Sequence, residues 1–291
     1  MLLPRLILSA LLLPGLLFAP AAAAETRVVA ATFPLWLMTR NVARDVPDLR
    51  LELLIPAGTG CPHDYALRPR DLLRLSGADL LILNGGGADA FIPRMARGAP
   101  AAKTPRILEA AAELEGSLQG NPHFFSSPSL AALLTEKIGA ALSAQDPGHA
   151  ALYTRNAGEY ARQMRDLAGK FADLGNRLGR PRILVQHDVF DPLARDAGLA
   201  VVGAIQAHEG QEPSAAKLLA LREQIRDQGV AAILVEARSP DRAGGILAGE
   251  GGIPLVSLDP AAGGPEDAPL DYFSQVMLRN LKALETALGN P

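Results

Sequence analysis

Four residues combine metal-binding side chains with turn-rich surroundings: His63 in GCPHDY, His123 in GNPHFF, His187 in VQHDVF and Asp259 in SLDP. A proline adjoins three of them, and its fixed φ angle limits the backbone entropy lost when an ion is captured. Three neutral imidazoles and one carboxylate suit tetrahedral Zn²⁺, with ligands at roughly 2.0–2.2 Å. Four protein ligands also leave no open position for the activated water that a catalytic zinc carries. The residue types therefore predict a zinc site that binds the ion without catalysis.

The other histidines and the single cysteine are weaker candidates. His149 lies in the first turn of a long helix, where a solvated histidine is ordinary, so we expect it at the surface. His208 lies in the acidic loop AHEGQEPS, which could lend it to the site. Cys61 precedes His63 by two residues, and such pairs can bind metal, although alternate residues of an extended segment need not converge. We expect a thiol that is buried or lies behind the ligands, and the roles of Cys61 and His208 stay open.

The elements that must position these residues alternate between strand and helix. Apolar runs predict strands at 27–33, 49–55, 79–84 and near 106–107, then at 182–186, 199–204, 231–236 and 254–258. This alternation predicts an α/β fold of two lobes, each with a mostly parallel sheet flanked by helices. Ligands bind at the carboxyl ends of parallel strands. Because two candidate ligands come from each half, we expect the site in the cleft between the lobes.

One long amphipathic helix separates the two halves. Apolar residues recur at spacings of three and four from Tyr153 to Leu178, and Asp146 and Pro147 suit a helix start. A helix of this length would run for nearly 50 Å at ~1.5 Å per residue, longer than one small domain needs. We expect a rigid connection between the lobes, the alternative being a helix packed on one domain. The predicted division is 1–24 signal peptide, 25–145 N-terminal lobe, 146–179 linking helix and 180–291 C-terminal lobe.

The first 24 residues predict export from the cytoplasm. Arg5, a short apolar run and four alanines before Glu25 are typical of a cleavable signal peptide. Without it, 27 basic residues face 31 acidic ones, a formal charge of −4 that argues against nucleic acid or an anionic membrane as partner. One cysteine cannot form an internal disulfide, so the fold must rest on its core. Gly85-Gly86-Gly87 lacks the spacing and the Lys-Ser/Thr of a nucleotide-binding loop. We expect an exported monomer.

The motifs resemble those of the metal-binding receptors of ABC transporters for zinc and manganese, the cluster A-I solute-binding proteins, a ZnuA- and TroA-like family. The matching segments are, in order, LLIPAGTGCPHDYALRPRDLLRLSGADLLILNGGG, NPHFFSSP, QHDVFDPLARDAGL, EPSAAKL and SLDP with VMLRNLKAL. By motif, the resemblance places the ligands on His63, His123, His187 and Asp259. It also implies two lobes bridged by a long helix, and a periplasmic receptor that delivers Zn²⁺ to an ABC permease, with no enzymatic activity. Because ligands must be deprotonated, affinity should fall as pH drops through the histidine range.

Three departures from the family pattern bear on the site. The family more often has Trp and Asp-Pro where this chain has Phe125 and Ser126-Ser127-Pro128, which leaves the surroundings of His123 open. The His-rich loop of many zinc members is absent, since 111–120 holds no histidine, so the resemblance does not extend to a role in scavenging or pre-loading metal. Manganese members tend to carry a carboxylate at the third ligand position. His187 at that position favours zinc.

Other functions remain as alternatives. The first is a manganese or iron receptor of the same class, which affinity alone does not distinguish from a zinc receptor because divalent metals follow the Irving–Williams order at most sites. A zinc hydrolase would use Glu209, Glu212 or Glu236 as general base and would need a water in place of one ligand. A periplasmic zinc chaperone, or an adhesin-like protein with a structural ion, is the third alternative. The affinity and the identity of the permease are not predicted.

Overall fold

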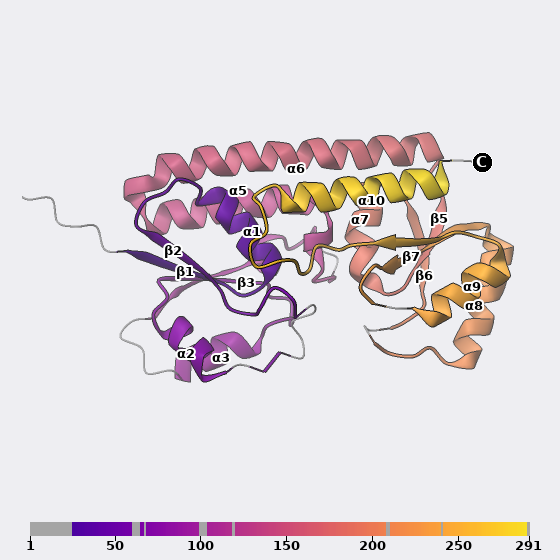
Figure 1. The fold of residues 1–291 in the computed structure, drawn as a ribbon, viewed down its shortest axis with the longest axis horizontal. Helices are drawn as coiled ribbons and strands as arrows, with labels where there is room; N and C mark the ends of the chain where they lie inside the picture. The colour runs from indigo at the N-terminus through magenta and orange to yellow at the C-terminus, as the bar shows by residue number, and fades with distance from the viewer. Residues whose placement is uncertain are drawn as a thin grey trace, which may run out of the picture.

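The computed structural model describes residues 25–59, 65–66, 68–98, 104–117, 120–207, 210–239 and 241–289. Two α/β lobes lie side by side beneath one long helix, α6 (Figure 1). Several sequence predictions fall outside the described residues, namely the signal peptide at 1–24, Cys61, His63, His208 and Glu209.

The N-terminal lobe is built on a four-stranded parallel sheet with the order β2-β1-β3-β4. Its strands are β1 (Thr26–Ala30), β2 (Leu49–Leu53), β3 (Leu80–Leu83) and β4 (Arg106–Glu109). Its helices are α1 (Phe33–Val42), α2 (Pro69–Ser76), α3 (Phe91–Gly98), α4 (Ala110–Glu113) and α5 (Pro128–Gln145), with the 3₁₀ turn η2 (Phe124–Ser126) before α5. β3 is buried along its whole length, as a continuous apolar run in a parallel sheet should be.

The C-terminal lobe repeats this topology, with the strand order β6-β5-β7-β8 in a second parallel sheet. Its strands are β5 (Arg182–Val185), β6 (Ala200–Ala204), β7 (Val230–Glu236) and β8 (Leu255–Leu258). Its helices are α7 (Asp191–Asp196), α8 (Ala215–Gln228), α9 (Arg242–Gly251) and α10 (Tyr272–Leu288), with the 3₁₀ turn η4 (Asp188–Phe190) before α7. The predicted fold class is confirmed, although the two halves share no recognisable sequence repeat.

The long helix α6 spans Ala150–Leu178, which corresponds to about 43 Å at ~1.5 Å per residue. It begins later than the sequence predicts, after the 3₁₀ turn η3 (Pro147–His149). Asp146 does not cap the turn through its side chain; its carboxylate pairs with the His149 ring at 2.7 Å and accepts the Tyr153 hydroxyl at 2.9 Å. The helix ends at Gly179, whose φ of 70° is the left-handed conformation that glycine tolerates best.

The apolar stripe of α6 faces the body of the protein. Its buried apolar members are Tyr153, Ala157, Tyr160, Ala161, Met164, Leu167, Phe171 and Leu174. Burial of a large side chain of this kind contributes about 1.5–3 kcal/mol, so the stripe fixes the helix firmly. One buried core continues from β1 and β3 through α6 to β5 and α10. The long helix is therefore shared by both lobes.

The segment between β8 and α10 gives a second connection, because it contacts the N-terminal lobe. Arg40 on α1 donates to the carbonyl of Ala268 at 2.6 Å, and Asn41 donates to the carbonyl of Leu270 at 2.9 Å. α10 then runs beneath α6 (Figure 1). With two connections on one side, we expect the lobes to move by small displacements in place of a wide hinge opening.

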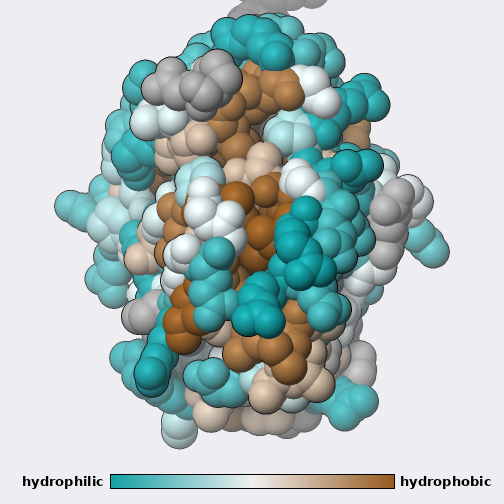
Figure 2. Space-filling model, turned by 90° about the vertical axis from the view of Figure 1, so that its right-hand side faces the viewer, coloured by the Kyte–Doolittle hydropathy of each residue, from teal (hydrophilic) through white to brown (hydrophobic). Residues whose placement is uncertain are grey.

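The surface at the C-terminal end of the molecule is mixed in character. Figure 2 shows hydrophobic surface between hydrophilic side chains on this end. Among the large apolar side chains exposed on this lobe are Leu219 on α8 and Ile246 on α9. Within the described ranges, no helix combines the length and the apolar character needed to cross a membrane.

Candidate metal centre

A pocket of about 270 Å³ lies between the two lobes. The N-terminal lobe contributes His123, Phe125 and the loop from Ala57 to Thr59, and the C-terminal lobe contributes residues that follow β5, β7 and β8. Three of the four predicted ligands, His123, His187 and Asp259, line it. His63, the fourth, lies outside the described residues, and Thr59 precedes it by four positions in the sequence. As placed, no three His, Cys, Asp or Glu side chains of the described residues form a preassembled metal cluster.

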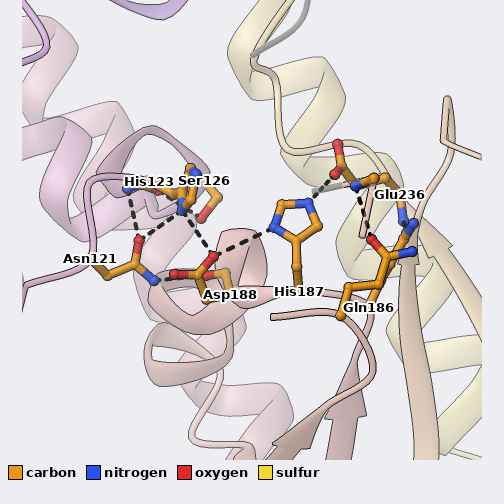
Figure 3. A network of polar contacts seen from close by, with 9 residues as sticks. Asn121, His123, Ser126, Gln186, His187, Asp188 and Glu236 are labelled. Atoms are coloured by element: carbon orange, nitrogen blue, oxygen red, sulfur yellow. Dashed lines mark hydrogen bonds and ion pairs between the residues drawn. The ribbon is translucent and has the colours of Figure 1, made fainter. Parts of the chain in front are cut away.

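His123 is held by Asn121 from the same loop. The Asn121 side-chain oxygen accepts the His123 backbone N–H at 2.8 Å and lies 2.9 Å from Nδ1 of the ring (Figure 3). Asp188 Oδ1 lies 3.4 Å from the same nitrogen. Two oxygen acceptors beside Nδ1 favour the tautomer protonated there, which puts the lone pair on Nε2, the geometry of a metal-binding histidine.

Asn121 also joins the two lobes at the pocket. Its side-chain nitrogen donates to the backbone carbonyl of Asp188 at 2.7 Å, next to His187. Asn84, which follows β3, donates to the carbonyl of Pro122 at 3.2 Å and fixes the loop from the other side. One amide side chain therefore sets the orientation of His123 and its position relative to the opposite lobe.

We expect Asn121→Ala to weaken zinc binding by about tenfold to a hundredfold, the range typical of residues that orient a metal ligand. The loss arises because His123 keeps its side chain but loses its fixed tautomer and position. Isothermal titration with a competing chelator measures the change. Asn176, exposed on α6, is the matched control, and Asn176→Ala should bind as wild type. An unchanged affinity in Asn121→Ala would show that Asn121 does not orient a ligand.

His187 lies at the point of the second sheet where the order of the strands reverses. It follows β5, whose neighbours are β6 on one side and β7 on the other. Such switch points are where ligands bind in open α/β sheets. The His187 side chain is almost fully buried, with Nε2 against Glu236 Oε1 and Nδ1 3.5 Å from Asp188 Oδ1 (Figure 3). Gln186 fixes Glu236 by accepting its backbone N–H at 2.8 Å.

Asp259 follows β8 directly and is fixed from α10. The Asn280 side chain accepts the Asp259 backbone N–H at 3.0 Å and donates to its carbonyl at 2.7 Å. Asp259 Oδ1 accepts the backbone N–H of Ala261 at 2.8 Å, which closes a tight turn over Pro260. The carboxylate is therefore anchored through Oδ1, and Oδ2 takes no part in the turn.

Two carboxyl groups that follow His187 in the sequence, those of Asp188 and Asp191, have shifted pKa values. The hydrogen bond from His187, helped by the charge of His123, lowers the pKa of Asp188. Burial, helped by the negative charge of Asp188, raises the pKa of Asp191 to about 6. Asp191 Oδ1 is buried and makes no hydrogen bond to the described residues. A charged Asp191 is therefore unfavourable in the folded protein.

This shift predicts how stability depends on pH. The pKa of Asp191 is higher folded than the ~3.9 of an unfolded aspartate, so its contribution to stability is full below pH ~4 and is lost as pH rises through 6. In metal-free protein, Asp191→Asn should raise the free energy of unfolding at pH 7.5 by at most about 1 kcal/mol, because solvent screens the half-buried charge. The gain should vanish near pH 4. Urea unfolding at both pH values tests this, and an equal gain at both would contradict it.

Most of the polar residues around the predicted ligands could not be identified from their positions in the sequence. Glu236 entered only as a possible hydrolase base, yet it is the last residue of β7, beside the strand that carries His187. The position of Glu236 at a strand end could have identified it as a site residue. Asp188 and Arg238 gave no such signal. His149, expected at the surface in the first turn of the long helix, lies in the 3₁₀ turn before α6, is partly buried against Asp146 and does not line the pocket.

Two lobes of like topology that share one rigid helix, with histidines and carboxylates in the pocket between them, define a solute-binding protein for metal ions. A model of the family described as "ZnuA: Zinc-uptake complex component A periplasmic" matches residues 28–287. The chain belongs to this family.

Individual relatives agree with the family assignment. The high-affinity zinc uptake system protein ZnuA of Bacillus subtilis is 28% identical over 284 residues, which cover 91% of this chain and 88% of that protein. The zinc-binding lipoprotein AdcA of Streptococcus pneumoniae is 28% identical over 281 residues, 90% of this chain but 55% of AdcA, so the chain spans about half of AdcA. The structure of the SBP FpvC from Pseudomonas aeruginosa in complex with Mn²⁺ has a TM-score of 0.76 at 30% identity, covering 91% of this chain and 98% of FpvC.

Proposed function

We propose that this protein is a periplasmic receptor that binds Zn²⁺ with high affinity and delivers it to an ABC permease for uptake. The observation that carries the proposal is the convergence of His123, His187 and Asp259 on one pocket between the lobes. Membership of the zinc-uptake family supports the same function. The receptor is expected to act as a monomer after removal of the signal peptide.

We propose His63, His123, His187 and Asp259 as the four ligands. Three imidazoles and one carboxylate form the donor set that zinc prefers. His187 Nε2 lies against Glu236, so an ion bound through that nitrogen has a second carboxylate beside it. Glu236 then helps to balance the charge of the ion, whereas Asp188, 3.5 Å from Nδ1, takes the place of the carboxylate in a carboxylate–histidine–zinc arrangement.

A hydrolase fits the pocket less well. Of the candidate general bases, Glu236 lies in the pocket, but its carboxylate contacts His187 and its backbone N–H is held by Gln186. Glu212, the other described candidate, is exposed and does not line the pocket. A base engaged with a proposed ligand supports the ion and is poorly placed to activate a water. We therefore propose a binding function without turnover.

Manganese is the alternative cargo, because carboxylates suit harder ions and the similar FpvC has a structure in complex with Mn²⁺. Affinity alone decides little, since most sites bind zinc more tightly than manganese. The test is the metal content of protein purified natively from the periplasm. One zinc per chain supports the proposal, whereas manganese, iron or no metal under zinc-sufficient growth would contradict it.

A further inference from the structure

An arginine faces the carboxylate that we propose as a metal ligand. Arg238 follows β7 by two positions and lines the same pocket as Asp259. Its Nη2 lies 3.7 Å from Asp259 Oδ2. The other carboxylate oxygen, Oδ1, already accepts the backbone N–H of Ala261. Oδ2 is therefore the oxygen that the arginine and an incoming ion would both approach.

The contacts of Arg238 keep its guanidinium near the pocket while leaving it able to move. Nη2 also donates to the hydroxyl of Tyr272 at 3.4 Å, and the Tyr272 ring is buried edge-on against Phe33, with ring centroids 5.6 Å apart. The Arg238 side chain is nevertheless 61% exposed, so it can turn into solvent without leaving a buried position. Among the described residues that line the pocket, it is the only lysine or arginine.

We infer that Arg238 is a built-in competitor for the metal ion. In the metal-free protein its guanidinium pairs with Asp259 and reduces the negative charge of the pocket. When a divalent ion binds to Asp259, the guanidinium is displaced towards solvent, because two positive groups within a few ångströms of each other repel. The pocket therefore holds the ion less tightly than its ligands alone would allow, which favours release to a transporter. The inference rests on the proposed function, since it requires Asp259 to bind the ion.

The test compares zinc affinity in wild type and Arg238→Gln by competition with a chelator at low and high salt. We expect Arg238→Gln to bind zinc about tenfold more tightly at low salt, the order expected for charge repulsion across a solvent-exposed rim, and the gain to shrink at high salt. Arg222 on α8 is the matched control, because it is similarly exposed and pairs with Glu250 at 3.9 Å away from the pocket. Arg222→Gln should bind zinc as wild type does.

A second background separates competition at Asp259 from a general effect of charge. In Asp259→Asn, the further change Arg238→Gln should give a much smaller gain; the full gain there would overturn the shared-oxygen assignment. An affinity that is unchanged or weaker in Arg238→Gln would also overturn the inference. In both cases the proposed function stands if wild type binds zinc and His187→Ala does not. If wild type binds no zinc, the proposed function itself fails.

Discussion

His187→Ala is expected to weaken zinc binding by at least about a thousandfold, beyond the tenfold to hundredfold typical of residues that only support a ligand. The His187 ring is almost fully buried between Glu236 and Asp188. Removing it takes away a proposed ligand and leaves two carboxylates without the imidazole between them. Competition titration against a zinc chelator measures the affinity, and a thermal melt of the metal-free protein shows whether the variant is folded.

His149→Ala is the control for this prediction. Among the described histidines, His149 is the one that does not line the pocket, and it pairs with Asp146 just before α6. Its replacement should leave zinc affinity unchanged. Equal losses in His149→Ala and His187→Ala would mean that the effect comes from general destabilisation, and the proposed ligand set would be wrong.

Gly175→Ala is expected to destabilise the protein by about 1–3 kcal/mol or more, the cost of overpacking a core. Gly175 lies on α6 where the helix meets the end of α7, and a Cβ atom there would lie 1.7 Å from the backbone carbonyl oxygen of Ala197. Backbone atoms on both sides cannot yield as a flexible side chain can. The long helix would have to move away from the C-terminal lobe, so the contact that fixes the lobe would weaken. Urea unfolding measures the loss.

The same helix provides the matched control. Gly169 is exposed on α6, and a Cβ atom there would meet nothing within 4 Å. Gly169→Ala should stabilise the protein by about 0.5–1 kcal/mol, because alanine loses less backbone entropy than glycine in a helix. If both substitutions stabilised the protein, α6 would not pack closely on the C-terminal lobe, and its role as a rigid connection would be wrong.

Much of the architecture could be predicted because each local pattern agreed with the fold. The continuous apolar run at 79–84 predicted the buried strand β3, and the stripe from Tyr153 to Leu178 predicted which face of α6 packs inward. The start of α6 was placed too early, because Asp146 and Pro147 are as suitable for a 3₁₀ turn as for an α-helix. Asp146 directs its carboxylate to two side chains, an interaction that local sequence does not reveal.

The candidate site was predictable as far as its residues follow strand ends. His187 and Asp259 come just after β5 and β8, and parallel topology brings such positions to one edge. The residues around them were not predictable, because their roles depend on contacts between segments far apart in sequence. Asn121 donates to Asp188 across 67 positions, and Arg238 reaches Asp259 from a different loop. The placement of His63 stays a prediction, as does the ligand role of all four residues.

The most direct test of the central claim is a crystal structure of the zinc-loaded protein with anomalous diffraction measured at the zinc absorption edge. We predict a single zinc peak per chain in the pocket between the lobes, with His123, His187 and Asp259 in contact with the ion and His63 as the fourth ligand. A zinc peak elsewhere, or a coordination sphere that lacks His187 or Asp259, would contradict the proposed metal centre.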